Sequence, residues 1–453
     1  MTKRTRTILF LICLLLFLLI TPTTIFYSQG YRFDFKNKRL TQTGGLFLKA
    51  EPKAVEIYIN GQLVKKTDFF FGSALIENLL PKRYKVEVKK EGYFVWEKNL
   101  EIREKEVTEV KNIVLFLKNP NFEILTKEVK NLWFSPDEKK IILSEVNEQG
   151  LWALKLFDLE RNIKSHLIQE VDVYSNYIPP LHPPASAGPS GADLMNLEFS
   201  EDSKEIYLDI RMKDSSPPTI LPLTKGGWSP QEKKFILKLD KFPPILTEKI
   251  LKEELPRENI ITSKKINNDV YHLDNFGHFF KNGEKLTEKS FPVKLETEYA
   301  LEIFQNFIFL KEGQILYQFI PQLKSFEKFF EGINDLKISP DNKKLVFFSN
   351  SEIWILFLKA EGTKKAGEKL FLIRLSEKIG DIFWLNSDYL IFNSGDYLKI
   401  VEIDDRDRIQ TWDIPLRPNF GVGADPKIYF NQSNKKLYIL SKGNLYDSEK
   451  LIR

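Results

Sequence analysis

The chain has 453 residues, and 67 Lys and Arg stand against 62 Asp and Glu, so its formal net charge is only +5. This near balance, with both signs interspersed, excludes the dense basic surface of a nucleic-acid-binding protein. The length exceeds one ordinary core and predicts two or three domains, and the 13% aromatic content favours strands over helices.

An apolar stretch near the N-terminus predicts a membrane anchor. Every residue from 8 to 20 is apolar, and the run continues to Tyr27, which gives about the 20 residues that a helix needs to cross a hydrocarbon core. Basic residues precede the stretch, at Lys3, Arg4 and Arg6. The positive-inside rule therefore predicts a single-pass protein of the cell membrane, with residues 1–29 as cytoplasmic stub and anchor and the bulk of the chain extracytoplasmic.

A cleaved secretory signal is the alternative, because a basic region followed by an apolar core also describes one. The best cleavage site, Ser28-Gln29-Gly30, does not resemble the usual small-residue pattern. Cys13 is the only cysteine and sits inside the apolar run behind Ile12, which speaks against a lipoprotein. Without disulfides, the exported part must be stabilised by apolar cores, and a Lys-rich, Cys-poor, Phe-rich composition suggests a prokaryotic protein.

Residues 43–117 alternate apolar and polar side chains in short runs, which predicts a small antiparallel β-sandwich. The clearest local signal is Asn60-Gly61 at the end of an alternating strand, because both residues accept the positive φ of a tight hairpin turn. The aromatic residues of this region are expected to fill the sandwich core or cover its edge, with a carbohydrate-stacking platform as the alternative for any exposed one. They are Tyr58, Tyr84, Tyr93 and Trp96.

The order of these turns and strands resembles the PEGA domain. The matching positions are 52–54, 55–61, 79–84 and Gly92-Tyr93, with Lys53 and Lys82 departing from the glycines of the family pattern. The resemblance implies an extracytoplasmic adhesive or spacer module without catalytic residues.

From residue 121 onward a strand, a polar turn and a second strand recur. Clear copies begin at Leu132, Leu197 and Leu336, and degraded ones at Ile382 and Ile428. The last three starts are each 46 residues apart, within the roughly 40 to 50 residues of a propeller blade. Two further copies, near 269–286 and 299–319, make about seven blades, with six or eight left open. Residues 122–126 are expected to supply a strand missing from the last copy and so close the ring.

Pro-rich stretches at 179–194 and 215–228 are expected to be loop insertions, which account for the longer spacing of the early copies. The Phe-Ser-Pro-Asp-x-Lys-Lys repeat resembles the WD40-like, TolB-type β-propeller family, which implies a binding platform. Ser-Pro-Asp is a turn device, because Pro presets φ and Asp bonds its own backbone, so we assign Asp137 and Asp341 to turns and not to catalysis.

The sequence has no nucleophile elbow, P-loop, zinc-protease motif or Cys-x-x-Cys pair, and we predict no catalytic, cofactor-binding or metal-binding residue. His272 and His278, with Asp274 between them, could share a metal in principle, but a hairpin carrying two ordinary histidines is the expected arrangement. Asp404, Asp405 and Asp407 lack the Gly and Glu of a calcium loop and are interpreted as a solvated turn.

The sequence therefore predicts a mostly β protein: a transmembrane helix, a PEGA-like sandwich and a propeller of about seven blades. Its expected role is that of a membrane-anchored binding or scaffold protein that holds a cell-wall or surface polymer or an envelope protein. The alternative is a propeller-borne hydrolase or lyase, which converging ionisable groups at the propeller mouth would favour. A sensor is disfavoured, because the stretch before the anchor is too short for an output domain.

Overall fold

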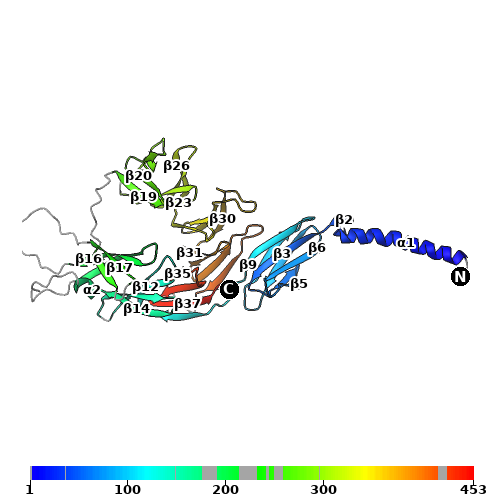
Figure 1. Ribbon diagram of the computed structural model, residues 1–453, viewed down its shortest axis with the longest axis horizontal. Helices are drawn as coiled ribbons and strands as arrows, with labels where there is room; N and C mark the ends of the chain where they lie inside the picture. Colours follow the sequence, from blue (N-terminus) through cyan, green and yellow to red (C-terminus); the bar gives the residue numbers. More distant parts are fainter. Residues whose placement is uncertain are drawn as a thin grey trace, which may run out of the picture.

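The computed structural model describes residues 3–35, 37–147, 149–175, 191–213, 232–240, 244–248, 259–294, 296–416 and 426–452. The helix α1 projects from one end of the molecule, a small β-sandwich follows it, and a larger group of sheets forms the other end (Figure 1). The C-terminus lies beside the sandwich, at the boundary between these two β regions (Figure 1).

Helix α1 spans Lys3–Ser28 and continues through Pro22. Its most apolar window has a mean hydropathy of 2.7 and contains no buried side chain, as expected of a helix that could cross a membrane or serve as a signal sequence. Thr23 and Thr24 donate their hydroxyl protons to the carbonyl oxygens of Leu19 and Ile20, at 2.8 and 2.7 Å. These bonds satisfy the two hydroxyl groups inside the helix itself.

A two-stranded hairpin, β1 and β2, comes directly after the helix, and two sheets then form the sandwich. One sheet has the order β6-β3-β9 and the other β5-β4-β7-β8. The bounds are β1 Tyr31–Asp34, β2 Arg39–Gln42, β3 Gly44–Glu51, β4 Glu56–Ile59, β5 Gln62–Lys66, β6 Ser73–Leu79, β7 Arg83–Lys89, β8 Trp96–Glu101 and β9 Val107–Val114.

The two sheets bury a common core because alternate residues of most strands face inward, whereas β5 is exposed along its whole length. The expected turn at Asn60-Gly61 is confirmed: both residues have positive φ, 49° and 80°, and Ile59 pairs with Gln62 across it. The prediction of a purely antiparallel sandwich is wrong, because β9 pairs with β3 in parallel. Alternation reveals which face of a strand is buried but not its direction, so the sequence pattern could not show this pairing.

Seven antiparallel four-stranded sheets make up the rest of the described chain. In chain order, the first six are β11 Val129–Phe134, β12 Lys140–Val146, β13 Trp152–Asp158 and β14 Ile163–Gln169; β15 Gly191–Phe199, β16 Glu205–Lys213, β17 Glu232–Lys238 and β18 Ile245–Glu248; β19 Ile260–Ile266, β20 Asp269–Asp274, β21 Phe279–Lys281 and β22 Glu284–Lys285; β23 Tyr299–Phe304, β24 Phe307–Glu312, β25 Ile315–Ile320 and β26 Ser325–Glu331; β27 Asp335–Ile338, β28 Lys344–Phe348, β29 Glu352–Phe357 and β30 Lys369–Arg374; and β31 Ile379–Asn386, β32 Tyr389–Ser394, β33 Tyr397–Glu402 and β34 Thr411–Pro415. A short helix, α2 Glu170–Ser175, follows β14.

The seventh sheet closes the series with a strand from its beginning. Its order is β10-β37-β36-β35, with β10 Phe122–Thr126, β35 Lys427–Phe430, β36 Lys436–Ser441 and β37 Asn444–Lys450. Phe122 pairs with Ser448 and Ile124 with Tyr446, so the expected closure by residues 122–126 is confirmed. The seventh sheet also shares an apolar cluster with the first, which includes Val129, Leu143 and Tyr438. This arrangement is that of a β-propeller.

Apolar clusters join most successive sheets, and central strands such as β28 and β32 are buried on both faces as a result. Within the described ranges, no cluster spans the second and third sheets. Most of residues 179–194 and all of 215–228 lie outside the described residues. Residues 191–194, however, belong to β15, where Gly191 pairs with Lys213, so the first insertion ends earlier than the prediction placed it.

The Ser-Pro-Asp turns have the geometry that their residues predict. Ser135 donates its hydroxyl proton to Asp137 Oδ1 at 2.6 Å, and the same oxygen accepts the N–H of Lys139 at 3.1 Å. Ser339 and Asp341 repeat this bond at 2.6 Å, and so do Ser200 and Asp202 at 2.7 Å in the copy that has Glu201 in place of the proline. The Ser200 hydroxyl is the main reason why the pKa of Asp202 lies below its ordinary value. These aspartates are therefore engaged in turns.

Candidate functional site

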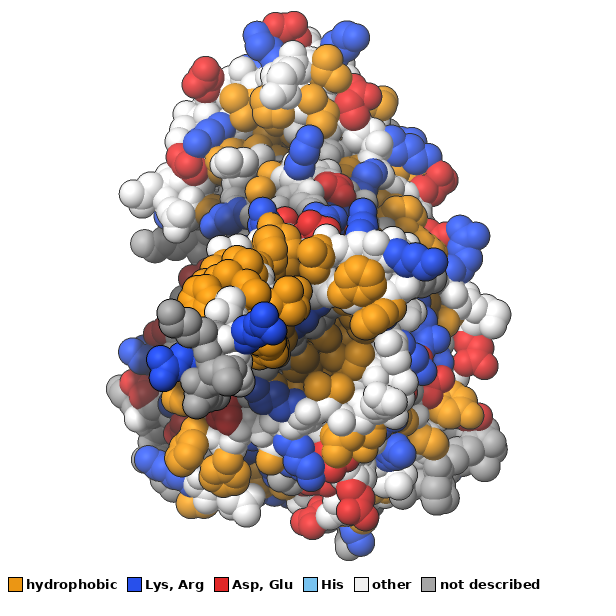
Figure 2. All heavy atoms as spheres, turned by 90° about the vertical axis from the view of Figure 1, so that its right-hand side faces the viewer, with side chains coloured by type: hydrophobic (Ala, Val, Ile, Leu, Met, Phe, Trp, Pro, Cys, Tyr) orange, Lys and Arg blue, Asp and Glu red, His pale blue; other side chains and the backbone are white. Residues whose placement is uncertain are grey.

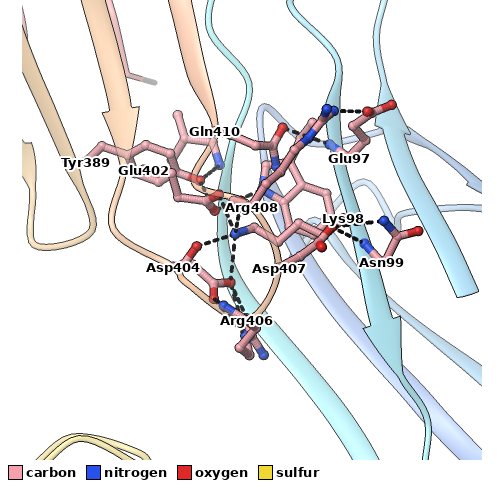
Figure 3. A network of polar contacts seen from close by, with 12 residues as sticks. Glu97, Lys98, Asn99, Tyr389, Glu402, Asp404, Arg406, Asp407, Arg408 and Gln410 are labelled. Atoms are coloured by element: carbon pink, nitrogen blue, oxygen red, sulfur yellow. Dashed lines mark hydrogen bonds and ion pairs between the residues drawn. The ribbon is translucent and has the colours of Figure 1, made fainter. Parts of the chain in front are cut away.

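The sandwich meets the propeller along strand β8, the edge strand of its four-stranded sheet. Two backbone N–H groups of β8 are satisfied by propeller side chains: Glu97 N–H donates to Gln410 Oε1 at 3.0 Å, and Asn99 N–H to Asp407 Oδ2 at 2.8 Å (Figure 3). Both acceptors lie in the connection between β33 and β34. An open sheet edge is thus covered by side chains of the neighbouring domain, which removes a site for unwanted strand pairing.

Lys98 is the centre of this junction. Its side chain is fully buried, and its Nζ lies 3.1 Å from Glu402 Oε2 and 3.7 Å from Asp404 Oδ2 (Figure 3). Nζ also donates to the carbonyl oxygen of Asp404. Glu402 accepts two further bonds on Oε1, from Trp96 Nε1 at 2.9 Å and from the Tyr389 hydroxyl at 3.2 Å. The junction therefore pairs a buried ammonium from the sandwich with buried carboxylates from the propeller.

Burial and charge act in opposite directions on the two carboxylates. Burial raises the pKa of Glu402 above its ordinary value, against the lowering effect of Lys98. Burial also opposes ionisation of Asp404, but the charges of Arg406 and Lys98 outweigh it and hold the pKa of Asp404 below its ordinary value. Arg406 binds Asp404 Oδ2 at 2.6 Å and donates to the Glu109 carbonyl of the sandwich at 2.7 Å. Arg406 therefore extends the network to a second sandwich strand.

Aromatic packing seals the same contact. Phe116, which follows β9, touches Tyr389 and Trp412 of the sixth sheet, with ring centroids 5.3 and 5.5 Å apart. Trp412 Nε1 donates to the Val95 carbonyl at 3.2 Å, and the Tyr389 hydroxyl accepts the Val114 N–H at 3.2 Å. Such ring pairs contribute about 0.5 to 1.5 kcal/mol each beyond their buried area. Apolar and ionic contacts together make the sandwich and propeller one continuous unit.

A cavity of about 360 Å³ adjoins the junction and is lined from both domains. At its propeller side Lys344, whose side chain is only 3% exposed, lies 2.8 Å from Glu361 Oε2 and 3.8 Å from Asp388 Oδ1. Burial raises the pKa of Asp388 above its ordinary value. Ionisable groups thus converge here, with Lys344 facing more than one carboxylate and Lys98 likewise facing both Glu402 and Asp404.

A second candidate surface lies at the centre of the propeller. The first strands of neighbouring sheets approach one another, β19 with β23 and β31 with β35, which places first strands around the axis. Aromatic side chains on these strands form a row: Phe383 lies 5.1 Å from Tyr429, which stacks on Phe134 with centroids 3.5 Å apart. A hollow of about 490 Å³ continues from Phe134 and Tyr429 to Phe199. We call Phe134, Phe199, Phe383 and Tyr429 the aromatic row.

A lysine stands at one end of the aromatic row. Lys337 Nζ lies 4.1 Å from the ring centroid of Phe383, within cation–π distance, and burial lowers the pKa of Lys337. The row therefore consists of half-buried aromatic rings with Lys337 at one end, and Glu198 lines the adjoining hollow. These features suit the binding of rings or apolar side chains more than acid–base chemistry.

The interpretation of Asp404, Asp405 and Asp407 as a solvated turn is wrong for two of the three. Asp404 and Asp407 bind Lys98 and Asn99 of the sandwich, whereas Asp405 is exposed and pairs with Lys364 at 2.8 Å. Their partners lie about three hundred residues earlier in the chain, so no local pattern could reveal them. A usable signal was present in β8, where alternation puts Lys98 in the same phase as the buried Trp96 and Leu100.

The other residues singled out by sequence have structural surroundings. Trp96 and Tyr84 are buried, Tyr93 packs against the core, and Tyr58 is half-buried and donates to Glu56 at 2.8 Å. His272 stacks on Phe280 at 4.8 Å, while Asp274 Oδ1 accepts the backbone N–H of His278 at 2.7 Å. No group of three potential metal ligands occurs in the part of the chain that the structure describes.

No protein-family model matches the chain, and no curated protein matches it in sequence. Among solved structures, the chain is similar to the WD40 repeats of RRP9, with a TM-score of 0.39 and 12% identity over 74% of this chain and 99% of that one. It is also similar to YCF48 from Cyanidioschyzon merolae, with a TM-score of 0.37 and 13% identity over 72% and 98% of the two chains. Neither likeness is strong enough to transfer a property of those proteins, so the propeller assignment rests on the sheet order and closure of this chain.

Proposed function

We propose that this chain is a membrane-anchored binding and scaffold protein of a prokaryotic cell envelope, whose sandwich and propeller stand outside the membrane as one rigid unit. The observation that carries the proposal is the junction: a buried Lys98–Glu402 pair, backbone bonds from β8 and the Phe116 contacts fix the two domains together. A rigid arm between anchor and propeller is what a display scaffold requires. The PEGA-like order of turns in the sandwich agrees with a spacer role.

Binding through the aromatic row fits this role. Aromatic faces stack on sugar rings and pack against apolar side chains, so a surface polymer or an envelope protein is the proposed partner. Lys337 adds one positive charge to the same surface. The TolB-type resemblance of the Ser-Pro-Asp repeats points to the same class of binding platform.

The polar bonding at the junction cavity favours binding over hydrolysis or lyase chemistry. A catalytic carboxyl needs an oxygen free to meet a substrate. Glu402 Oε1 accepts bonds from Trp96 and Tyr389, and Oε2 is buried and forms the ion pair with Lys98, so neither oxygen is open to a substrate. Asp388 lies against Lys344, so we assign these groups to holding the fold.

Cysteine labelling tests the proposed topology. Because Cys13 is the only cysteine, Cys13→Ser gives a cysteine-free chain into which single reporters can be placed. Phe70→Cys puts one on the sandwich, where the parent side chain is 77% exposed, and Thr5→Cys puts one before the apolar stretch. In intact cells a membrane-impermeant maleimide should label position 70, and position 5 only after permeabilisation. Reversed labelling, or a mature chain that lacks α1, would contradict the proposal.

A further inference from the structure

The hairpin that follows the helix has two unlike faces. Phe33 pairs with Leu40 across the hairpin, while Arg32 pairs with Thr41 and Asp34 with Arg39. Because side chains alternate along a strand, Tyr31, Phe33 and Leu40 share one face and the polar pairs share the other. Phe35, at the turn, packs on Phe33 with ring centroids 5.1 Å apart. We call Tyr31, Phe33, Phe35 and Leu40 the hairpin apolar face.

This apolar face is open to its surroundings. Phe33 is 46% exposed, Leu40 55% and Phe35 84%. Side chains of that size bury little of their apolar area here, and an exposed apolar patch usually marks a contact with a partner or a membrane. Helix α1 projects toward the viewer in Figure 2, and apolar side chains gather at the centre of this side with charged side chains around them.

The hairpin apolar face is continuous with the surface of the helix. The Tyr31 ring makes an edge contact with Phe26 of α1, with centroids 5.5 Å apart. Only Gln29 and Gly30 separate the last helical residue, Ser28, from β1. The exposed rings therefore begin where the apolar stretch ends, at the depth where aromatic side chains prefer to sit in a bilayer.

The opposite face holds the hairpin in a defined orientation. The Arg32 guanidinium lies 3.5 Å from the Tyr27 ring centroid, and it donates to the Tyr27 carbonyl at 2.9 Å and to Asn78 Oδ1 of the sandwich at 2.8 Å. Thr41 is buried, and Thr43 N–H donates to the Gly30 carbonyl at 2.9 Å. Arg32 thus ties helix, hairpin and sandwich together, so the direction of the hairpin apolar face relative to the helix is fixed.

We propose that the hairpin apolar face inserts into the boundary between headgroups and acyl chains of the leaflet from which the chain emerges, and so sets the tilt of the whole extracytoplasmic unit. The inference rests on the proposed membrane anchoring. Lys38, exposed at the hairpin turn, stands where lipid phosphates would meet it. The occupant is a lipid surface because the apolar face extends directly from the apolar surface of α1.

Site-directed fluorescence on the full chain tests the insertion. In the Cys13→Ser background, Phe35→Cys and Leu40→Cys carry an environment-sensitive fluorophore on the apolar face. Arg39→Cys carries it next to Leu40 on the opposite face, and Phe70→Cys carries it in the β5–β6 connection. That connection lies at the propeller end of the sandwich. The Gly72 carbonyl accepts the Ala50 N–H, and the next residue, Glu51, lines a small hollow together with Leu451 and Ile452 at the C-terminal end of the propeller. The chains are reconstituted into vesicles of phosphatidylethanolamine and phosphatidylglycerol, with and without doxyl-labelled lipid.

We expect the emission from positions 35 and 40 to shift to shorter wavelength and to be quenched by doxyl lipid. The emission from position 70 should be neither shifted nor quenched, and that from position 39 should be quenched less than that from position 40. Equal, water-like emission at 35 and 70 in chains that float with the vesicles would overturn the insertion and leave the anchor intact. A shift at 35 that grows with protein density but is not quenched by lipid would also overturn it, and would indicate a second copy of the chain as the occupant. Chains that do not float with the vesicles would overturn the anchoring itself and the insertion with it.

Discussion

Lys98→Ala should destabilise the docking of the sandwich on the propeller by about 3 to 5 kcal/mol, the usual effect of removing one partner from a buried ion pair. The Lys98 side chain is fully buried and faces Glu402, whose own side chain is only 4% exposed. Without the ammonium, Glu402 must either stay ionised without a countercharge or take up a proton. Either change weakens the contact that holds the two domains in register.

Thermal unfolding and limited proteolysis of the full chain in detergent measure this effect. Lys98→Ala should lower the midpoint of unfolding and expose the β33–β34 connection to protease. Lys66→Ala is the matched control, because it removes an exposed ion pair with Glu56 at 2.9 Å in the same sandwich and should change stability little. The double change Lys98→Met with Glu402→Gln should recover much of the loss, since it leaves no buried charge unpaired. Equal behaviour of the Lys98 and Lys66 variants would contradict the assigned role of Lys98.

Lys344→Ala should destabilise the propeller itself by about 2 to 4 kcal/mol. This is less than for a fully buried ion pair, because water reaches the carboxylates that Lys344 faces. Lys344 opens β28 and faces Asp341, Glu361 and Asp388 between the fifth and sixth sheets. Lys140 occupies the same place in the first copy of the repeat, but its Nζ donates to a neutral carbonyl, that of Ser203, at 3.3 Å. Lys140→Ala is therefore the matched control, with an expected loss of about 1 kcal/mol.

The loss in Lys344→Ala should depend on pH. Burial already raises the pKa of Asp388 above the ordinary 3.8, and loss of the lysine raises it further. A carboxyl whose pKa is higher in the folded than in the unfolded chain binds its proton more tightly in the folded chain. Its contribution to the free energy of unfolding is fully present below the unfolded pKa and is lost as the pH rises through the folded pKa. The stability difference between Lys344→Ala and the parent chain should therefore shrink as the pH falls towards 3.8. A difference that grows on acidification, measured by denaturant unfolding, would contradict this account of Lys344.

Features encoded by neighbouring residues could be predicted from the sequence. The apolar run forms α1, Asn60-Gly61 forms a hairpin turn, and the Ser-Pro-Asp repeats form turns between strands. Closure by β10 could be predicted as well, because the last copy of the repeat was one strand short. Each of these features is determined either by a few neighbouring residues or by a repeat that occurs often enough for its copies and their strands to be counted.

Features that depend on distant partners could not be predicted. The parallel pairing of β9 with β3 leaves the same alternation as an antiparallel one. Asp404 and Asp407 have the composition of a solvated turn, and only the approach of Lys98 and Asn99 makes them part of a buried network. Lys98 itself was the missed signal, a charge in the inward phase of a strand, which calls for an opposite charge somewhere else in the fold.

A distance distribution between two spin labels tests most directly whether the sandwich and the propeller form one rigid body. In the Cys13→Ser background, Val107→Cys labels the sandwich and Ile163→Cys labels the propeller, both at exposed positions. The pair Leu63→Cys and Val107→Cys places both labels on the sandwich, at exposed positions. The width of its distance distribution is the reference for two labels on one rigid body. We predict a single distribution between positions 107 and 163 that is as narrow as this internal reference, and one that broadens in Lys98→Ala. A broad or multiple distribution in the parent chain would contradict the rigid-unit account.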